Sequence, residues 1–218
     1  MQIIKQSDLN FSDVVAALKN GKTIVYPTET CYGLGCDARN NEAVEKVVKI
    51  KQRQENKPML VVVPDAAMAL EYLEWSPKLQ ELADKYWFTR CSPPAMGRAD
   101  GDEPGALTIV ARAKENCGLA AGVVAKDGTV AFRVTSHSVA ARLGRELGAP
   151  LVSTSANIAG QEPSYKVEDI IKMFSNAVDQ PDIIIDAGEL PRRAPSTIVR
   201  VMDGRVEVLR QGEVAVNL

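Results

Sequence analysis

Hydrophobic and polar residues follow two patterns along the chain, and these patterns predict strands and helices in turn. Runs rich in β-branched and aromatic residues, which favour buried strands, lie at 23–26, 59–63, 107–111, 129–134, 151–152 and 183–185. Apolar residues three and four positions apart, which favour amphipathic helices, lie at 12–19, 42–51, 66–73, 76–87, 136–147 and 165–174. This order of elements predicts an α/β fold.

Turn and capping residues add detail to this prediction. Ser12 and Ser136 are suited to cap the helices that follow them, and Gly21 and Gly148 are suited to end those helices. Asp203-Gly204 separates two strand-like segments, which predicts a tight hairpin of antiparallel strands. Because strands linked by helices tend to be parallel, we expect a mixed sheet.

The stretch 88–103 follows neither pattern. It contains Pro93-Pro94, Gly97 and Gly101 and has almost no periodicity, which favours a loop. We therefore expect one domain over residues 1–218 with a surface insertion at 88–103. The chain of 218 residues is 45% hydrophobic and 25% charged, which is typical of a globular domain.

The net charge and the N-terminal sequence bear on nucleic-acid binding, secretion and membrane insertion. The net charge is −2, so contact with nucleic acid would have to use a local basic patch. The first residues lack the pattern of a signal peptide, and no apolar run approaches the length of a membrane span. We expect a cytoplasmic protein with no membrane partner.

The cysteines do not indicate a metal site. Cys31, Cys36, Cys91 and Cys117 form no C-x-x-C pair, and His137 is the single histidine. A structural zinc site takes four ligands in tight pairs, so we expect free thiols and no metal ligands. His137 has no partnered Ser or Cys that would define a catalytic triad, so we interpret it as structural.

Two segments suit a small anionic ligand. Residues 26–38 run from a strand into Thr28 and Thr30 and then Gly33 and Gly35, which offers hydroxyls and close backbone approach, or else a tight structural turn. Residues 49–58 place four cations at a helix end. They would form a phosphate clamp, or else a solvated face that complements the helix dipole.

Three further segments carry polar residues at strand ends. Arg133 lies near the end of a strand, where α/β proteins bind ligands, and needs an anionic partner there, either a ligand or a structural salt bridge. Residues 153–160 suit hydrogen bonds to a nucleotide, or else form a polar turn with Asn157 in a left-handed conformation. Residues 192–199 form a basic turn that leads into Ser196.

Together these segments resemble a known family. The motifs are Y-P-T-E-T-x-Y-G-L-G at 26–35, K-x-R at 51–53, V-A-x-R at 130–133, S-x-S-A-N-x-x-G at 153–160 and P-S-T-I-V at 195–199. Taken in order from Ile3 to Gly212, the chain is similar to the YrdC-type threonylcarbamoyl-AMP synthases. The resemblance implies a twisted mixed α/β sheet flanked by helices with a concave basic cavity, a fold shared with dihydroxybutanone-phosphate synthase.

The resemblance also implies an activity and partners. L-threonine, bicarbonate and ATP would give threonylcarbamoyl-AMP and pyrophosphate, a nucleotidyl transfer. A threonylcarbamoyl-transferase complex would then use the product to modify tRNA, and direct contact with tRNA is possible. Such a reaction needs alignment and charge neutralisation rather than a side-chain nucleophile. Mg²⁺ would be held mainly by the ATP phosphates.

Residue roles carry over from the matching motif positions. The threonine contacts implied by the resemblance are Thr30, Arg133, Ser153 and Ser196, and the ATP contacts are Lys51, Arg53, Lys57, Thr129, Ser155 and Arg210. Charge neutralisation would fall to Lys51, Arg53 and Arg133, and no catalytic nucleophile is expected.

The chain departs from the family pattern in three places. Lys57-Pro58-Met59 stands where the family often has Asn-Pro-Leu, and Val62 stands where it often has a threonine-side His. The family's Trp-Pro-Gly run is split by residues 88–103.

Other functions fit parts of the pattern. The same fold could serve as a tRNA- or double-stranded-RNA-binding module without adenylate-forming activity. A carbamoyl-transfer domain of hydrogenase maturation normally sits in a much longer chain. A dihydroxybutanone-phosphate synthase would need an acidic metal-binding cluster, which the five segments lack.

Deleting residues 88–103 tests the surface insertion. Because long loops add little closure entropy, we expect the deletion variant to stay folded and to bind ATP. Circular dichroism and ATP titration measure this, and an aggregated variant would show that the segment is not a surface loop.

Overall fold

The computed structural model describes residues 1–53, 58–88 and 106–216. The insertion predicted at 88–103 lies outside these residues except for Phe88, and Lys57 lies outside them as well. The insertion, the single-domain boundaries and the role of Lys57 therefore stay predictions. Among the described residues, no helix has the length and apolar character needed to cross a bilayer.

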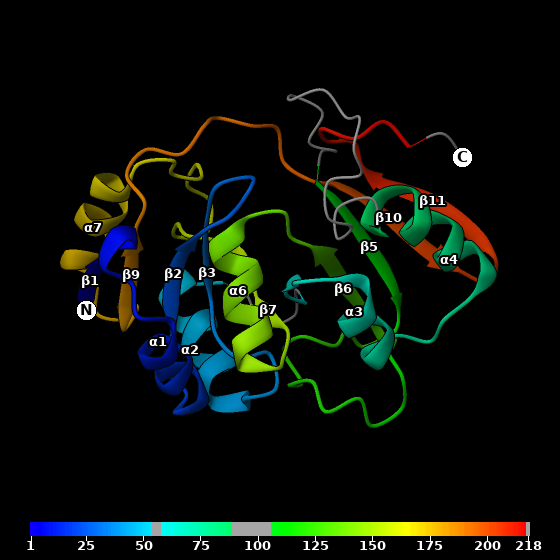
Figure 1. Cartoon of the computed structure of the whole chain (residues 1–218), viewed down its shortest axis with the longest axis horizontal. Coiled ribbons are helices and arrows are strands. Elements are labelled where there is room, and N and C mark those ends of the chain that lie inside the picture. Colours follow the sequence, from blue (N-terminus) through cyan, green and yellow to red (C-terminus); the bar gives the residue numbers. More distant parts are fainter. Residues whose placement is uncertain (54–57, 89–105, 217–218) are drawn as a thin grey trace.

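The described strands form two sheets, which Figure 1 shows on either side of helix α6. The first has the order β1-β9-β2-β3-β8 and consists of β1 (Gln2–Lys5), β9 (Ile183–Asp186), β2 (Ile24–Pro27), β3 (Tyr32–Gly35) and β8 (Thr154–Ser155). The second has the order β11-β10-β5-β6-β4-β7 and consists of β11 (Arg205–Arg210), β10 (Thr197–Met202), β5 (Leu107–Arg112), β6 (Thr129–Val134), β4 (Val61–Val63) and β7 (Leu151–Val152).

Both sheets are mixed, as the sequence predicts. β9 pairs in parallel with β1 and β2, and β10 pairs in parallel with β5 but antiparallel with β11. The sequence pattern did not show that the strands divide between two sheets. The chain crosses from one sheet to the other at Ser153, which lies between β7 and β8.

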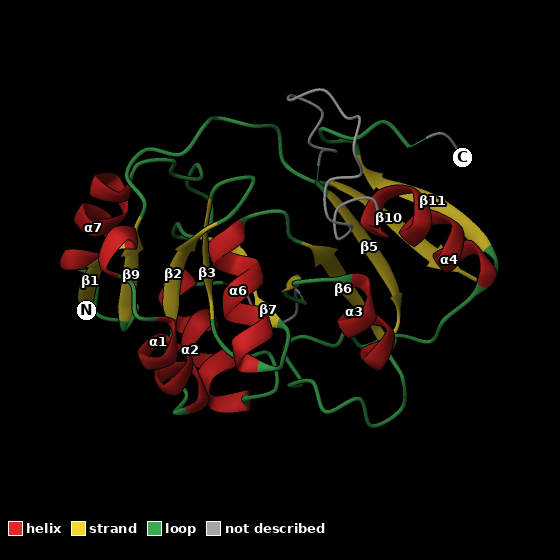
Figure 2. Cartoon of the chain, in the orientation of Figure 1, coloured by secondary structure: helices red, strands yellow, loops and turns green. Residues whose placement is uncertain are grey.

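Helices cover both sheets (Figure 2). The described helices are α1 (Phe11–Lys19), α2 (Asn41–Lys51), α3 (Ala66–Tyr72), α4 (Pro77–Ala83), α6 (Ser138–Leu147) and α7 (Val167–Ser175), with a 3-10 turn η1 (Gln6–Asp8) and a π-helix η2 (Asp84–Phe88) that continues α4. Helix α6 packs against α1, β2 and β4, and so joins the two sheets. The α/β class is confirmed.

Two clusters of buried residues hold these layers together. The larger one contains Leu34 of the first sheet, Phe132 of the second, and Trp87 of η2. The smaller one packs Leu143 of α6 against Tyr26 of β2 and neighbouring residues. Because the larger cluster draws on both sheets, the two sheets share one apolar core.

Two predicted helix caps are wrong. Helix α1 is capped by the side chain of Asn10, which accepts a hydrogen bond from Ser12 N, so Ser12 lies inside the first turn. Helix α6 is capped by His137, whose Nδ1 accepts from Val139 N at 3.3 Å, rather than by Ser136. His137 is thus structural, as predicted, with the specific role of a cap.

The predicted turns are confirmed. Gly148 ends α6 in the left-handed region at φ 67°. Asp203 and Gly204 join β10 to β11 with φ values of 50° and 73°, which is the backbone of a type I′ hairpin turn.

Gly35 on β3 permits a close approach of the two sheets. A Cβ built at this position would lie 1.7 Å from the carbonyl oxygen of Val152 on β7. Residue 35 must therefore lack a side chain if β3 is to pass against the crossing point at Ser153.

Gly35→Ala tests this contact. Since backbone has to move to relieve the clash, we expect the variant to lose at least about 3 kcal/mol of unfolding free energy, or to fail to fold. Gly148→Ala is the matched control, because its Cβ would meet nothing within 4 Å. Its left-handed backbone should cost about 1–2 kcal/mol. Equal losses for both variants in denaturant unfolding would contradict the account.

Candidate active site

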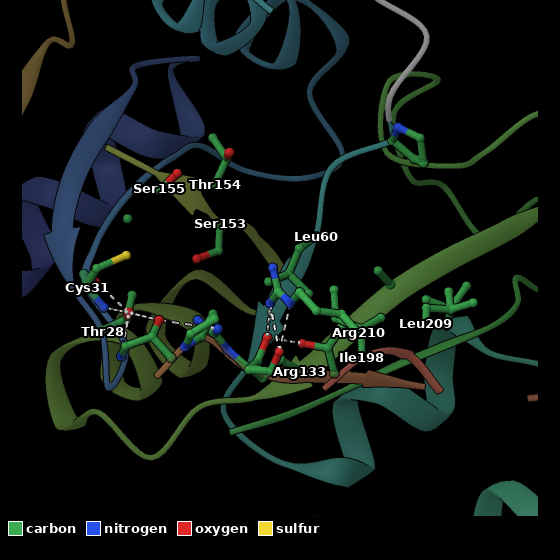
Figure 3. A pocket seen from close by; sticks show the side chains of 18 of the residues that line it. Thr28, Cys31, Leu60, Arg133, Ser153, Thr154, Ser155, Ile198, Leu209 and Arg210 are labelled. Carbon is green, nitrogen blue, oxygen red and sulfur yellow. Dashed lines mark hydrogen bonds between the residues drawn. The ribbon is translucent and has the colours of Figure 1, made fainter. Parts of the chain in front are cut away.

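A cavity of about 950 Å³ lies between the two sheets. Its volume is at the upper end of the roughly 300–1,000 Å³ typical of small-molecule sites. Basic residues outnumber acidic ones in its lining, with Lys51, Arg53, Lys126, Arg133, Arg193, Arg200 and Arg210 against Asp127 and Glu162. Figure 3 shows Ser153 and Ser155 on one side of the cavity and Arg133 and Arg210 on another. The concave basic cavity is therefore present.

The structure brings nine of the ten predicted site residues to this one cavity. They are Thr30, Lys51, Arg53, Thr129, Arg133, Ser153, Ser155, Ser196 and Arg210. The tenth, Lys57, lies outside the described residues. Shared placement does not assign roles to them, so their contacts with substrates remain proposals.

The β2–β3 hairpin turns around the hydroxyl of Thr28. This hydroxyl donates to Cys31 O at 2.6 Å and accepts from the backbone N–H of Thr30 and of Cys31. The side chains of Thr28, Thr30 and Cys31 all line the cavity. The hairpin is therefore both a tight structural turn and a cavity wall, so the two interpretations of this motif are compatible.

Arg133 on β6 reaches across to this hairpin. Its Nε lies 2.9 Å from Glu29 Oε1, and both side chains are 5% exposed. Its Nη1 donates to Thr30 Oγ1 at 3.4 Å, and in Figure 3 the side chain extends toward the hairpin that carries Thr28 and Cys31. The structural salt bridge considered from the sequence is thus present, and Arg133 still lines the cavity.

Lys51, the last residue of α2, holds the loop that follows β8. Its Nζ donates to the carbonyl and hydroxyl of Ser155 and to the carbonyl and Oδ1 of Asn157, at 2.6–3.1 Å. Burial, with a smaller contribution from the nearby Arg53, lowers the pKa of its ammonium to about 8. Lys51 is therefore both a source of positive charge and an anchor for the Ser155 loop.

Arg210 on β11 is held by Ser196. Its Nη2 donates to Ser196 O at 2.7 Å and to Ser196 Oγ at 3.0 Å. Ser196 Oγ in turn accepts from Thr108 Oγ1 at 2.9 Å. Burial, with repulsion from Arg133, lowers the pKa of the Arg210 guanidinium, so Arg210 carries its charge in a poorly solvated part of the cavity.

Thr129 and Arg53 occupy other parts of the wall. Thr129 donates through both its hydroxyl and its backbone N–H to Asp127 Oδ1, at 2.7 and 3.1 Å. Arg53 follows the end of α2 and donates to Pro58 O at 3.2 Å. Burial lowers the pKa of the Arg53 guanidinium, so Arg53 also presents a partly desolvated charge.

The structure shows where Val62 lies and which conformation Asn157 adopts. Val62 lies in the smaller apolar cluster at 1% exposure and is not among the residues that line the cavity. Asn157 is absent from the non-glycine residues with positive φ in the described part of the chain, so the alternative of a polar turn with a left-handed Asn157 does not hold. Its side chain instead accepts from Lys51 and Ser155.

Several cavity residues were missed by the sequence analysis. Lys126, Asp127, Glu162 and Arg200 line the cavity but belong to no motif that stands out in the sequence. Glu29 stands inside the Y-P-T-E-T motif, and its acidic side chain between two threonines was a signal that could have identified the partner of Arg133.

The arrangement suits electrostatic binding rather than covalent catalysis. Burial raises the pKa of the Cys31 thiol, which disfavours the nucleophilic thiolate at neutral pH. Cys31, Cys36 and Cys117 form no disulfide, as predicted, and Cys91 lies outside the described residues. Across 1–53, 58–88 and 106–216, no three His, Cys, Asp or Glu residues are grouped so that they could hold a metal ion. Guanidinium, ammonium and hydroxyl groups suit phosphate and carboxylate ligands.

Known proteins resemble this chain over most of its length. The family model described as telomere recombination, Sua5/YciO/YrdC, matches residues 16–212. A threonylcarbamoyl-AMP synthase of Thiobacillus denitrificans is 36% identical over 88% of this chain and 90% of its own length. One of Idiomarina loihiensis is 33% identical over 88% of this chain and 92% of its own length.

Solved structures share the fold. P. abyssi Sua5 complexed with L-threonine superposes with a TM-score of 0.76 at 23% identity over 97% of this chain. This chain spans 57% of the length of that protein. E. coli YciO has a TM-score of 0.74 at 24% identity, over 97% of this chain and 94% of its own. By the extent of the family match and the identity to these synthases, the chain belongs to the Sua5/YciO/YrdC family.

Proposed function

We propose that the protein is a threonylcarbamoyl-AMP synthase that converts L-threonine, bicarbonate and ATP into threonylcarbamoyl-AMP and pyrophosphate. One observation carries the proposal, namely that Thr30, Lys51, Arg133, Ser155 and Arg210 converge from distant segments on one cationic cavity. The curated relatives with this name cover most of the chain.

The chemistry needs alignment more than a reactive side chain. The threonine amine attacks CO₂ with loss of a proton, or bicarbonate with loss of water, and forms a carbamate. An oxygen of the carbamate then attacks the α-phosphorus of ATP. The bond from that phosphorus to the bridging oxygen breaks, and pyrophosphate leaves. Charge develops on phosphate oxygens, so fixed cations stabilise the transition state.

The roles proposed for the individual residues are those that the family resemblance implies. Arg133 holds the threonine carboxylate, with Thr30, Ser153 and Ser196 beside it. Arg53, Lys51 and Lys57 neutralise the phosphates, and Thr129, Ser155 and Arg210 contact the nucleotide. Lys51 also holds the Ser155 loop in place, because four oxygens of Ser155 and Asn157 share the three N–H donors of its ammonium.

Magnesium fits this donor set as a companion of the phosphates. Asp127 and Glu162 are the acidic residues among the described lining residues, so the wall offers no cage of carboxylates. Mg²⁺ commonly binds through substrate phosphates and a few carboxylates. When bound, it would neutralise phosphate charge.

The product is an activated acyl donor. A threonylcarbamoyl-transferase complex would take it up and transfer the group to an adenosine of tRNA. The positive cavity wall leaves direct contact with tRNA open as part of this proposal.

Separate Arg53→Ala and Arg133→Ala variants test the proposal through pyrophosphate release. Each loses charge-assisted hydrogen bonds, so kcat/KM should fall roughly tenfold to hundredfold. Arg53→Ala should act mainly on the KM for ATP, and Arg133→Ala on the KM for threonine. Arg145→Ala is the control, because Arg145 is exposed on α6. Full release in both variants, or release independent of threonine and bicarbonate in the wild type, would contradict the proposal.

A pH titration tests the role of Lys51. Its pKa of about 8 lies below the ordinary 10.5, and the ammonium is the form that attracts phosphate. The competent form is therefore lost as pH rises through about 8, and ATP affinity should fall by up to about tenfold per pH unit above it. Lys51→Arg keeps its charge throughout this range, so its ATP affinity should stay level. Titration calorimetry measures the ATP affinity of the wild type and of Lys51→Arg across this pH range. The same decline in Lys51→Arg would show that a group other than Lys51 causes the pH dependence.

A further inference from the structure

Glu29 lies directly behind the site rather than in it. Its neighbours Thr28 and Thr30 line the cavity, whereas Glu29 is not among the lining residues. Its side chain is 5% exposed. A buried carboxylate is costly unless it is paired, so its position calls for a specific role.

Both carboxylate oxygens of Glu29 are engaged from the opposite sheet. Oε1 lies 2.9 Å from Arg133 Nε, and Oε2 accepts from Thr135 Oγ1 at 2.5 Å. Arg133 belongs to β6, and Thr135 directly follows that strand. Thr135 therefore orients the Glu29 carboxylate, and the carboxylate in turn holds Arg133.

The contact fixes one edge of the Arg133 guanidinium. Glu29 occupies the Nε side, while Nη1 reaches Thr30 Oγ1 on the cavity wall. Burial, and after it repulsion from Arg133, lowers the pKa of the Arg210 guanidinium. The negative charge of Glu29 behind Arg133 offsets the repulsion between these two cations.

The pair also spans the two sheets. Glu29 stands on the hairpin of the first sheet, and Arg133 stands on β6 of the second. The link therefore sets the separation of two cavity walls at the point where a carboxylate would bind.

We propose that Glu29 is a positioning residue for amino-acid binding, which holds the Arg133 guanidinium in the orientation that receives the substrate carboxylate. This inference rests on the proposed function. Glu29 acts through Arg133 and has no direct contact with the substrate.

Steady-state pyrophosphate release by Glu29→Gln tests the inference. The amide keeps the shape but removes the charge that faces Nε, so the KM for threonine should rise roughly tenfold or more. The KM for ATP should change by less than about threefold, because the phosphate contacts are elsewhere. Thr135→Val, which frees Oε2, should raise the KM for threonine in the same direction by a smaller factor.

A control separates positioning from stability. Asp182→Asn removes another carboxylate that is paired within the first sheet region, with Lys22 and Thr23, and Asp182 does not line the cavity. It should lower the melting temperature without changing the KM for threonine. A Glu29→Gln enzyme that loses stability while keeping both KM values would overturn the inference.

The Nε–H resonance of Arg133 in ¹⁵N-labelled protein gives an answer that does not depend on turnover. Assigned by its loss in Arg133→Lys, it should move to a new chemical shift in Glu29→Gln, because the negative charge 2.9 Å from Nε is removed. An unchanged resonance would overturn the inference, even if Glu29→Gln fails to turn over. If the wild type releases no pyrophosphate with threonine, the proposed function fails instead.

Discussion

Positive charge held away from water in the walls of one cavity is the constraint on which the rest of this structure depends. A buried cation is costly unless protein groups or a ligand compensate it. Arg133 has a carboxylate behind it, Lys51 has four oxygens around it, and Arg210 is held by Ser196. Each cation is thus oriented before an anionic substrate arrives, which is the arrangement that electrostatic catalysis requires.

The fold brings two sheets into contact, so that groups on one sheet can compensate buried charges on the other. The crossing at Ser153 carries the chain from β7 to β8 and so from one sheet to the other. Gly35 lets β3 approach that crossing, because any side chain there would meet the carbonyl of Val152. The shared apolar core then holds the sheets at a fixed separation, and compensating groups from one sheet reach charges on the other.

Much of the fold could be predicted from local pattern, and the exceptions have physical causes. Strand β6 and the Asp203-Gly204 turn were predictable because periodicity and turn chemistry are local. Strand β3 was missed because two glycines mask its strand character. Asn10 and His137 displaced the serines as caps because several nearby residues were able to accept the same backbone hydrogen bonds. The division into two sheets depends on long-range pairing, which no local pattern contains.

In the site, too, local motifs were predictable and long-range contacts were not. Ordered motifs predicted which polar residues share the cavity, and nine of them line it. Their partners were harder to predict, because Glu29 meets Arg133 and Asn157 meets Lys51 across long stretches of sequence. Lys126, in the turn before β6, and Arg200, on β10, line the cavity and belong to no motif.

The central claim is that this cavity joins threonine, carbonate carbon and the AMP moiety in one molecule. Mass spectrometry of the reaction product formed from ¹³C-bicarbonate, threonine and ATP tests it most directly. We expect an adenylate that carries both the threonine and the ¹³C label and that is lost when any one substrate is omitted. Pyrophosphate or AMP formed without a ¹³C-labelled threonylcarbamoyl adenylate would contradict it.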